Sequence, residues 1–176
     1  NRPMMGTVNS KLDQILDLIE FIHTEIPDGN ALCQFVTLRS LNEVGATHAF
    51  IAELKPGGLI IPVYQFGFTD EEVASWTISS IDDHIPTADA LKTNSIVWLA
   101  DNEDWERDYP ALIQHKIPTA ETFICWPIHI RGAYMSVIGV LFKEVILQSH
   151  ELKNYLETLS GLVGLQLSSL KRTRSN

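Results

Sequence analysis

The sequence has few cysteines and no long apolar run, and each shortage excludes a class of protein. No stretch approaches the roughly 18 consecutive apolar residues of a membrane-spanning helix. The two cysteines, Cys33 and Cys125, have a spacing that fits neither a zinc site nor a Cys-x-x-Cys redox motif. With 45% hydrophobic and 20% charged residues in a chain of 176, the composition indicates one compact globular domain.

Basic residues are also scarce, and the shortage is local. Lysine and arginine number 13 against 22 aspartate and glutamate residues. Residues 70–108 contain eleven acidic residues and only Lys92 and Arg107 as bases, so this segment carries the whole net charge of −9. Without a basic stripe to displace counterions from phosphates, we expect no nucleic-acid binding by this chain. No secretory signal opens the chain, so we expect a cytoplasmic protein with no membrane partner.

Motifs for catalysis, phosphate binding and metal binding are missing. There is no G-x-S-x-G motif, and Gly57 and Gly58 lie in a predicted turn that precedes no helix. Neighbouring residues of an extended chain point to opposite faces, so at most Asp82 and His84 of the Asp-Asp-His stretch could converge. That arrangement favours a solvated acidic loop. We therefore expect no catalytic residue, no metal site and no cofactor.

The hydrophobic pattern predicts an α+β fold. Ser10 and Asp13 have the spacing of a capping box, which predicts that the first helix begins at Ser10. Periodicity and turn residues predict helices over 10–26, 30–44, 70–76, 87–93 and 149–170, and strands over 47–54, 59–68, 77–81, 95–100, 122–130 and 133–142. This order favours an antiparallel sheet with helices packed on its faces.

Two stretches resemble a GAF domain, the ligand-sensing module of many bacterial signalling proteins. DHIPTADALKT at residues 83–93, followed by 96–99, is similar to the short helix that leads into a strand of that family. Residues 121–142 are similar to its paired strands, with Pro127 and Gly139 in familiar places. The resemblance implies residues 1–9 as an N-terminal extension, 10–170 as one sensory domain and 171–176 as the start of a linker to an effector.

The resemblance also implies an architecture and a pocket. We expect a six-stranded antiparallel sheet, with the terminal helices on one face and short helices over a ligand pocket on the other. Period-2 spacing places Tyr64 and Phe66 together on one face of the sheet, and Phe50 and Ala52 likewise. The expected ligand-binding residues are mostly aromatic: Phe50, Tyr64, Phe66, Trp76, His84, Thr87, Trp98 and Cys125. Because the acidic segment would roof this pocket, its field repels anions and favours a neutral or weakly cationic small molecule.

The leading hypothesis is a non-enzymatic regulatory domain that senses a small molecule, dimerises and controls signalling or transcription. Leucines 152, 159 and 162 are spaced to form a seam, and residues 12–26 offer a matching second stripe, so we expect a parallel homodimer through the terminal helices. By analogy, the effector could be a DNA-binding domain of the LuxR type. In the alternative hypothesis, the pocket binds no ligand and the domain serves only to form the dimer.

Two other functions stay open. The first is the acyl-homoserine-lactone (autoinducer) binding domain of a LuxR-type regulator. Such a domain has a set of tryptophan, tyrosine and aspartate residues in its ligand pocket, and Trp98, Asp101 and Trp105 match that set poorly. The second is the GAF-type free methionine sulfoxide reductase, which uses clustered cysteines. Covalent bilin binding is disfavoured, because Trp126 rather than histidine follows Cys125.

Overall fold

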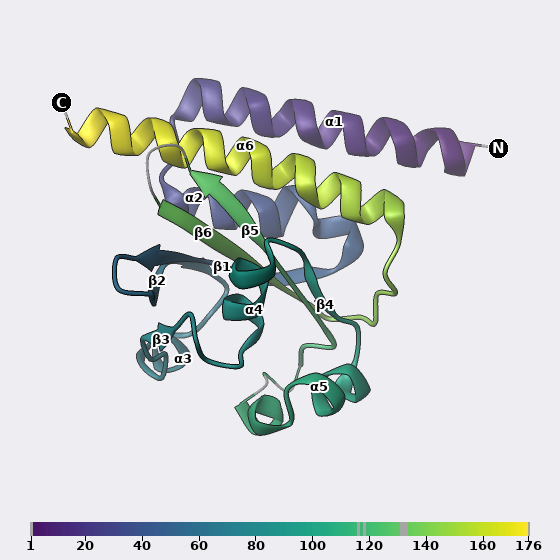
Figure 1. The fold of residues 1–176 in the computed structure, drawn as a ribbon. Coiled ribbons are helices and arrows are strands. Elements are labelled where there is room, and N and C mark those ends of the chain that lie inside the picture. Colours follow the sequence, from purple (N-terminus) through teal and green to yellow (C-terminus); the bar gives the residue numbers. More distant parts are fainter. Residues whose placement is uncertain (1, 116, 118, 131–133, 176) are drawn as a thin grey trace.

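The computed structural model describes residues 2–115, 117, 119–130 and 134–175 and has the α+β architecture that the sequence predicts (Figure 1). The α-helices are α1 (Arg2–Glu25), α2 (Gly29–Phe35), α3 (Asp70–Ala74), α4 (Pro86–Thr93), α5 (Asn102–Asp108) and α6 (His150–Ser175). The strands are β1 (Ala46–Lys55), β2 (Leu59–Phe66), β3 (Ser79–Ser80), β4 (Val97–Leu99), β5 (Thr122–Ile130) and β6 (Tyr134–Phe142). A π-helical turn covers Val36–Ser40, and 3₁₀ turns cover Asn42–Val44 and Pro110–His115.

The strands form one six-stranded antiparallel sheet in the order β3-β2-β1-β6-β5-β4. The two predicted hairpins, β1–β2 and β5–β6, meet at its centre, where Ile51 pairs with Ile138. Both Ile128 and Ile138 are 1% exposed, as the alternation of the second hairpin predicts. The expected six-stranded sheet is therefore confirmed. The turn of that hairpin, residues 131–133, lies outside the described residues.

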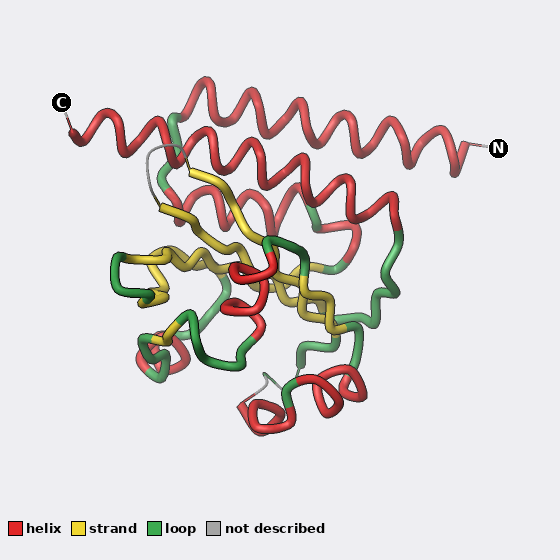
Figure 2. The backbone as a smooth tube through the Cα atoms, viewed as in Figure 1, coloured by secondary structure: helices red, strands yellow, loops and turns green. Residues whose placement is uncertain are grey.

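Helices cover both faces of the sheet (Figures 1 and 2). On one side, here called the helical face, α2 packs on β1 and β2, α6 packs on β5, and α1 lies along α6 (Figure 1). On the other side, here called the distal face, α4 packs against β4, β5 and β6, with α3 and α5 nearby (Figure 2). The long helices and the short ones thus enclose the strands in three layers.

Strict alternation along the strands separates two hydrophobic cores. In β5, Ile124 and Trp126 belong to the core of the helical face, whereas Phe123 and Cys125 belong to the core of the distal face. This is the period of 2 that an extended chain imposes. The helical-face core also contains Cys33 of α2. The two cysteines therefore lie on opposite faces of the sheet.

Three local expectations were wrong or incomplete. The first helix begins at Arg2, and Ser10 is not its cap, because the Ser10 hydroxyl donates to Glu43 Oε1 at 3.1 Å instead. The predicted second helix is divided, since α2 passes into the π-helical and 3₁₀ turns before it ends at Gly45 (φ +89°). Within the expected leucine seam, Leu152 and Leu159 are buried at 6% and 1% exposure. These two side chains belong to the core and are not available to a second subunit.

Within the described residues, no helix combines the length and the apolar character that crossing a membrane requires.

Candidate functional site

Four aromatic rings lie in contact over the centre of the distal face. Phe50 projects from β1 and stacks on Phe123 of β5, with ring centroids 6.1 Å apart and planes 13° apart. Phe68, which follows β2, and Trp76, which follows α3, pack edge to face at 4.8 Å. Trp76 in turn lies 6.0 Å from Phe50. Such tilted and offset pairs contribute about 0.5–1.5 kcal/mol each beyond area burial.

The row of rings continues toward α5. Trp105 stacks on Phe123 at 5.6 Å, Tyr109 lies 6.3 Å from Trp105, and the imidazole of His84 stacks on Tyr109 at 4.7 Å. Trp105 is 8% exposed, and its Nε1–H has no hydrogen-bond partner among the described residues. The distal face therefore carries a continuous aromatic surface with one buried indole donor left unpaired. Here "the aromatic row" denotes Phe50, Phe68, Trp76, Trp105, Tyr109, Phe123 and His84.

A carboxylate, Asp89 of α4, organises the polar end of this row. The hydroxyl of Tyr109 donates to Asp89 Oδ2 at 2.6 Å, and His84 Nδ1 lies 3.3 Å from the same oxygen. Lys92 Nζ lies 3.3 Å from Asp89 Oδ1. His84 Nε2 lies 2.6 Å from the carbonyl oxygen of Asp108, which can only accept, so Nε2 carries a proton. The helix begins at Pro86, which places Asp89 in the first turn, where a negative charge is favoured.

Burial and the Asp89 charge keep the neighbouring acids protonated. Burial, assisted by the hydrogen bond to Asp89, raises the pKa of the Tyr109 hydroxyl, so this group remains a donor. Burial, with a smaller contribution from Asp89, raises the pKa of the Cys125 thiol. Thiol nucleophiles act as thiolates. Cys125 is therefore a buried, protonated residue that packs in the distal core of the folded protein.

The structure divides the eight predicted ligand-binding residues between the two faces. Five lie on the distal side: Phe50, Trp76, His84, Thr87 and Cys125. The other three pack against the helical-face core: Tyr64, Phe66 and Trp98. Tyr64 fills the space that a side chain at Gly29 would need, and Trp98 Nε1 donates to the carbonyl of Ile146 at 2.9 Å. The expected aromatic wall of Tyr64, Phe66, Trp76 and Trp98 therefore does not form.

The reason is the register of the first hairpin. Period-2 spacing correctly groups Tyr64 with Phe66, and Phe50 with Ala52. However, Phe50 pairs with Gln65, so the flanking residues of β2 point to the opposite face. Only the register between β1 and β2 decides which residues of the two strands share a face, and the sequence of either strand alone does not give that register.

Several residues of the cluster were missed by the sequence reasoning. Asp89 follows His84 by five residues and lies in the first turn of a short helix, which is a usable local signal. Tyr109 lies twenty residues from Asp89 and has no such signal. Likewise, Phe68, Trp105 and Phe123 come from three separate segments that only the fold brings together.

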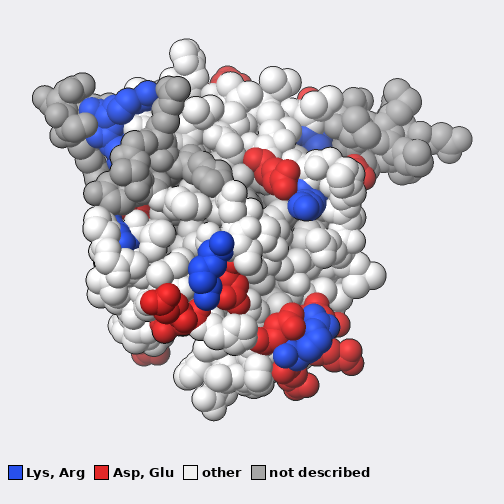
Figure 3. Space-filling view, in the orientation of Figure 1, with Lys and Arg blue, Asp and Glu red and all other residues white. Residues whose placement is uncertain are grey.

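Charge and metal-ligand chemistry complete the description of the distal side. Acidic side chains gather over α4 and α5, with basic side chains among them (Figure 3). The ion pairs there join Lys92 to Asp89, and Arg107 to Asp104 and Asp108. Arg107 is exposed and pairs with Asp104 and Asp108 at 3.0 Å, so part of the segment's charge is compensated locally. Across the described residues, no three or more His, Cys, Asp or Glu side chains converge as metal ligands would.

Comparison with known proteins identifies the fold. No family model and no curated protein matches this sequence. Among solved structures, the GAF domain of an Acinetobacter phosphoenolpyruvate-protein phosphotransferase has a TM-score of 0.70 at 15% identity, covering 93% of this chain and 96% of its own. The corresponding domain from Coxiella burnetii has a TM-score of 0.68 at 14% identity, covering 93% and 98%. The chain therefore has the fold of a GAF domain.

The same fold includes enzymes. The free methionine-R-sulfoxide reductase of Neisseria meningitidis, solved in complex with its substrate, has a TM-score of 0.70 at 12% identity, covering 93% of this chain and 91% of its own. The prediction that this chain is not an enzyme is therefore wrong as an inference from the fold. A fold shared by regulatory domains and reductases does not separate binding from catalysis.

Proposed function

We propose that this chain, with its GAF fold, is a regulatory domain that dimerises through its terminal helices and responds to a small molecule at the distal face. The observation that carries the proposal is an uncovered apolar strip on those helices. Leu12, Leu16 and Ile19 of α1 are 55%, 62% and 44% exposed, and Leu165 of α6 is 68% exposed. Several large apolar side chains exposed on the same helices are typical of an interaction site.

The spacing of the strip fits a helical partner. Leu12, Leu16 and Ile19 follow each other at four and three residues, the alternation of a coiled-coil seam. A second copy of the chain offers the same strip, so a two-fold dimer covers both at once. The part of the strip on α1 lies within the second stripe, residues 12–26, that the sequence predicts, whereas Leu152 and Leu159 of the predicted leucine seam are buried inside the domain.

Sedimentation velocity tests the assembly. The wild-type domain at tens of micromolar is expected to sediment as a dimer, and the double variant Leu16→Glu/Ile19→Glu as a monomer with a near-wild-type melting temperature. The matched control is Ile78→Glu, which changes an apolar side chain that is 60% exposed in the loop after α3. A wild-type monomer, or a dimer that survives the double variant, contradicts this part of the proposal.

The ligand that the distal face suits is neutral or cationic and partly aromatic. The aromatic row offers stacking surfaces, and Asp89 offers a carboxylate beside them. The cover over this surface is weakly held, since α3 contributes no buried residue. Phe68 and Trp76, on either side of α3, are half-buried and must move aside for a ligand to reach Phe50. The acidic segment 70–108, which includes Asp89, disfavours phosphates.

Calorimetric titration with four probes tests the ligand class. Tryptamine (cationic) and indole (neutral) are expected to bind, and cyclic AMP and cyclic GMP are not. Asp89→Asn is expected to weaken tryptamine about tenfold or more, since a hydrogen bond to a charged group contributes about 1.5–3 kcal/mol. Asp82→Asn, with the same charge change at an exposed position, serves as the control. Micromolar binding of either cyclic nucleotide overturns the assignment.

Two free, buried cysteines support a reducing compartment and therefore a cytoplasmic location for this domain. They also bear on the reductase alternative, which the Neisseria structure keeps open. A dithiol mechanism needs neighbouring thiols, and Cys33 and Cys125 lie on opposite faces of the sheet. An NADPH-coupled assay with free methionine sulfoxide measures this activity directly, and turnover there would replace the regulatory proposal.

A further inference from the structure

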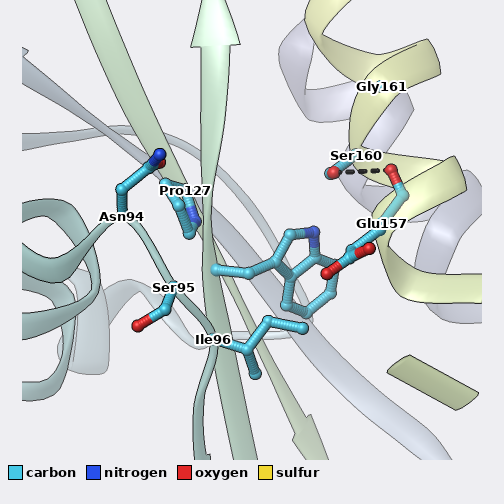
Figure 4. Close-up of a pocket in the computed structure, with 8 residues that line it drawn as sticks. Asn94, Ser95, Ile96, Pro127, Glu157, Ser160 and Gly161 are labelled. Carbon is cyan, nitrogen blue, oxygen red and sulfur yellow. Dashed lines mark hydrogen bonds between the residues drawn. The ribbon is translucent and has the colours of Figure 1, made fainter. Parts of the chain in front are cut away.

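A cavity of about 330 Å³ lies beside β5, between α6 and the segment that follows α4 (Figure 4). Its walls come from Asn94, Ser95 and Ile96 before β4, from Trp126 and Pro127 of β5, and from Glu157, Ser160 and Gly161 of α6. Figure 4 shows the residues of α6 facing the 94–96 segment across the open space. The cavity exists because β4 begins only at Val97, which pairs with Cys125, so the next part of β5 is not covered by that strand. Its volume suits a small ligand.

One wall of the cavity contains an unpaired buried donor. Trp126 is 1% exposed, and its indole Nε1–H has no hydrogen-bond partner among the described residues. Trp98, on the neighbouring strand, shows the usual solution, since its Nε1–H donates to the carbonyl of Ile146 at 2.9 Å. A buried donor without an acceptor destabilises the protein, and few remain unpaired in native structures. The nitrogen atom itself is shielded in this structure, so a molecule bound in the cavity supplies the missing acceptor to Trp126 only after the indole turns toward it.

The opposite wall is kept open by a glycine that packing does not require. Gly161 lies inside α6, where glycine is less favourable than alanine. A Cβ at this position would have no atom of the protein within 4 Å. Nothing in the fold therefore excludes a side chain there, and the effect of the glycine is to leave space next to Glu157 and Ser160 (Figure 4).

The polar groups of the lining define the chemistry of an occupant. Glu157 supplies the one carboxylate, no lysine or arginine contributes to the lining, and Asn94, Ser95 and Ser160 supply neutral polar groups. Ser160 already donates its hydroxyl to the backbone carbonyl of Glu157 at 2.8 Å, which leaves the carboxylate of Glu157 for a ligand. A carboxylate attracts a cation or a hydrogen-bond donor, whereas the indole N–H needs an acceptor.

We propose that this cavity binds a small amine that also carries a hydroxyl or carbonyl oxygen. The ammonium group pairs with the carboxylate of Glu157, and the oxygen accepts from Trp126 Nε1–H. The site lies beside β5 and shares no residue with the distal cluster around Asp89, so it stands independently of the proposed function. Because Glu157, Ser160 and Gly161 belong to α6, an occupant contacts the same helix that carries Leu165 of the apolar strip.

Nuclear magnetic resonance observes the proposed contact directly. The four tryptophans give four indole signals in a ¹H–¹⁵N correlation spectrum, and Trp126→Phe identifies the one in the cavity. Titration with ethanolamine and with glycinamide is expected to move the Trp126 indole proton downfield in a saturable manner. The Trp98 signal, already hydrogen-bonded, is expected to stay in place. Acetate, an anion of similar size, is expected to leave both signals unchanged.

Two variants separate the proposed contacts from a general effect. Glu157→Gln is expected to weaken ethanolamine binding about two- to fivefold, the range of an exposed ion pair. Glu106→Gln, the same change at an exposed position of α5, is expected to leave the affinity unchanged. Gly161→Leu fills the open space on an exposed helix position and is expected to abolish the shift while the Trp98 signal reports an intact fold.

Three results overturn the inference. The first is a Trp126 signal that neither amine moves. The second is a shift that acetate produces equally. The third is a shift that depends on the protein concentration and not on the amine concentration. That result would show that the cavity is a contact between two copies of the chain.

Discussion

The ring of Phe50 on β1 lies directly over Gly139 of β6, its partner across the two central strands. A Cβ at Gly139 would collide with this ring and would also lie within 3.0 Å of Phe123. The missing side chain therefore allows Phe50 to lie flat on the distal face and to stack on Phe123 with only 13° between the planes. The stacked pair Phe50–Phe123, at the centre of the aromatic row, therefore depends on the absence of a side chain at Gly139.

Substitution of Gly139 tests this dependence. Gly139→Ala is expected to lower the free energy of unfolding by about 1–3 kcal/mol, because the methyl group overpacks the distal core. Gly161→Ala is the matched control and is expected to raise it by about 0.5–1 kcal/mol, through helix propensity without any clash. Urea unfolding measures both. Equal effects of the two alanines would show that Phe50 does not need the space over Gly139.

Two leucines of α6 are predicted to respond differently to the same charge. Leu159 is 1% exposed and Leu165 is 68% exposed. Leu159→Glu buries an unpaired charge and is expected to abolish cooperative folding, since that penalty reaches several kcal/mol. Leu165→Glu is expected to fold normally and to weaken self-association. Thermal unfolding followed by circular dichroism distinguishes the two, and a cooperative near-wild-type melt of Leu159→Glu would contradict the packing of α6 on the sheet.

The two thiols are predicted to be inert in the folded protein. Burial raises the pKa of both Cys33 and Cys125, with smaller contributions from Asp28 and Asp89 respectively. Neither is therefore expected to react with Ellman's reagent at pH 8, whereas both react after unfolding in guanidinium chloride. Rapid reaction of a native thiol would indicate an accessible thiolate and would favour redox chemistry.

The buried carboxylate of Glu53 is predicted to contribute pH-dependent stability. Burial tends to raise its pKa, but hydrogen bonds from Lys55 Nζ at 2.8 Å and Lys171 Nζ at 3.0 Å outweigh burial and hold the pKa below its usual value. A group whose folded pKa is lowered stabilises the protein above its unfolded pKa, about 4.3 for glutamate, and loses that contribution as the pH falls through the folded value.

Glu53→Gln measures the size and sign of that contribution. At pH 7 the variant is expected to unfold about 1.5–3 kcal/mol more easily than the wild type, the cost of losing a charged hydrogen-bond partner. The difference is expected to shrink below about pH 4, where the wild-type carboxylate becomes protonated. A constant difference between pH 7 and pH 3 would show that the charge of Glu53 does not stabilise the fold.

The sequence alone determined the elements and their class. Alternation and turn residues located both central hairpins, and the short helix expected over 70–76 forms as α3, with Thr69 as its cap. Sheet and helix periods arise within a few residues of chain, so they can be read locally. Burial of Ile128 and Ile138 follows from the same alternation.

Only the tertiary structure decided which residues meet. Period-2 spacing groups residues of one strand, but the pairing of Phe50 with Gln65 sends Tyr64 and Phe66 to the opposite face. Helical periodicity marks leucines, but whether Leu159 meets the sheet or a second subunit depends on how α6 is rotated on β5. The Tyr109 hydroxyl donates to Asp89 across twenty residues of chain because α4 and the end of α5 converge over the distal face. Each of these relations is a contact between separate elements, and its geometry is fixed by packing rather than by local sequence.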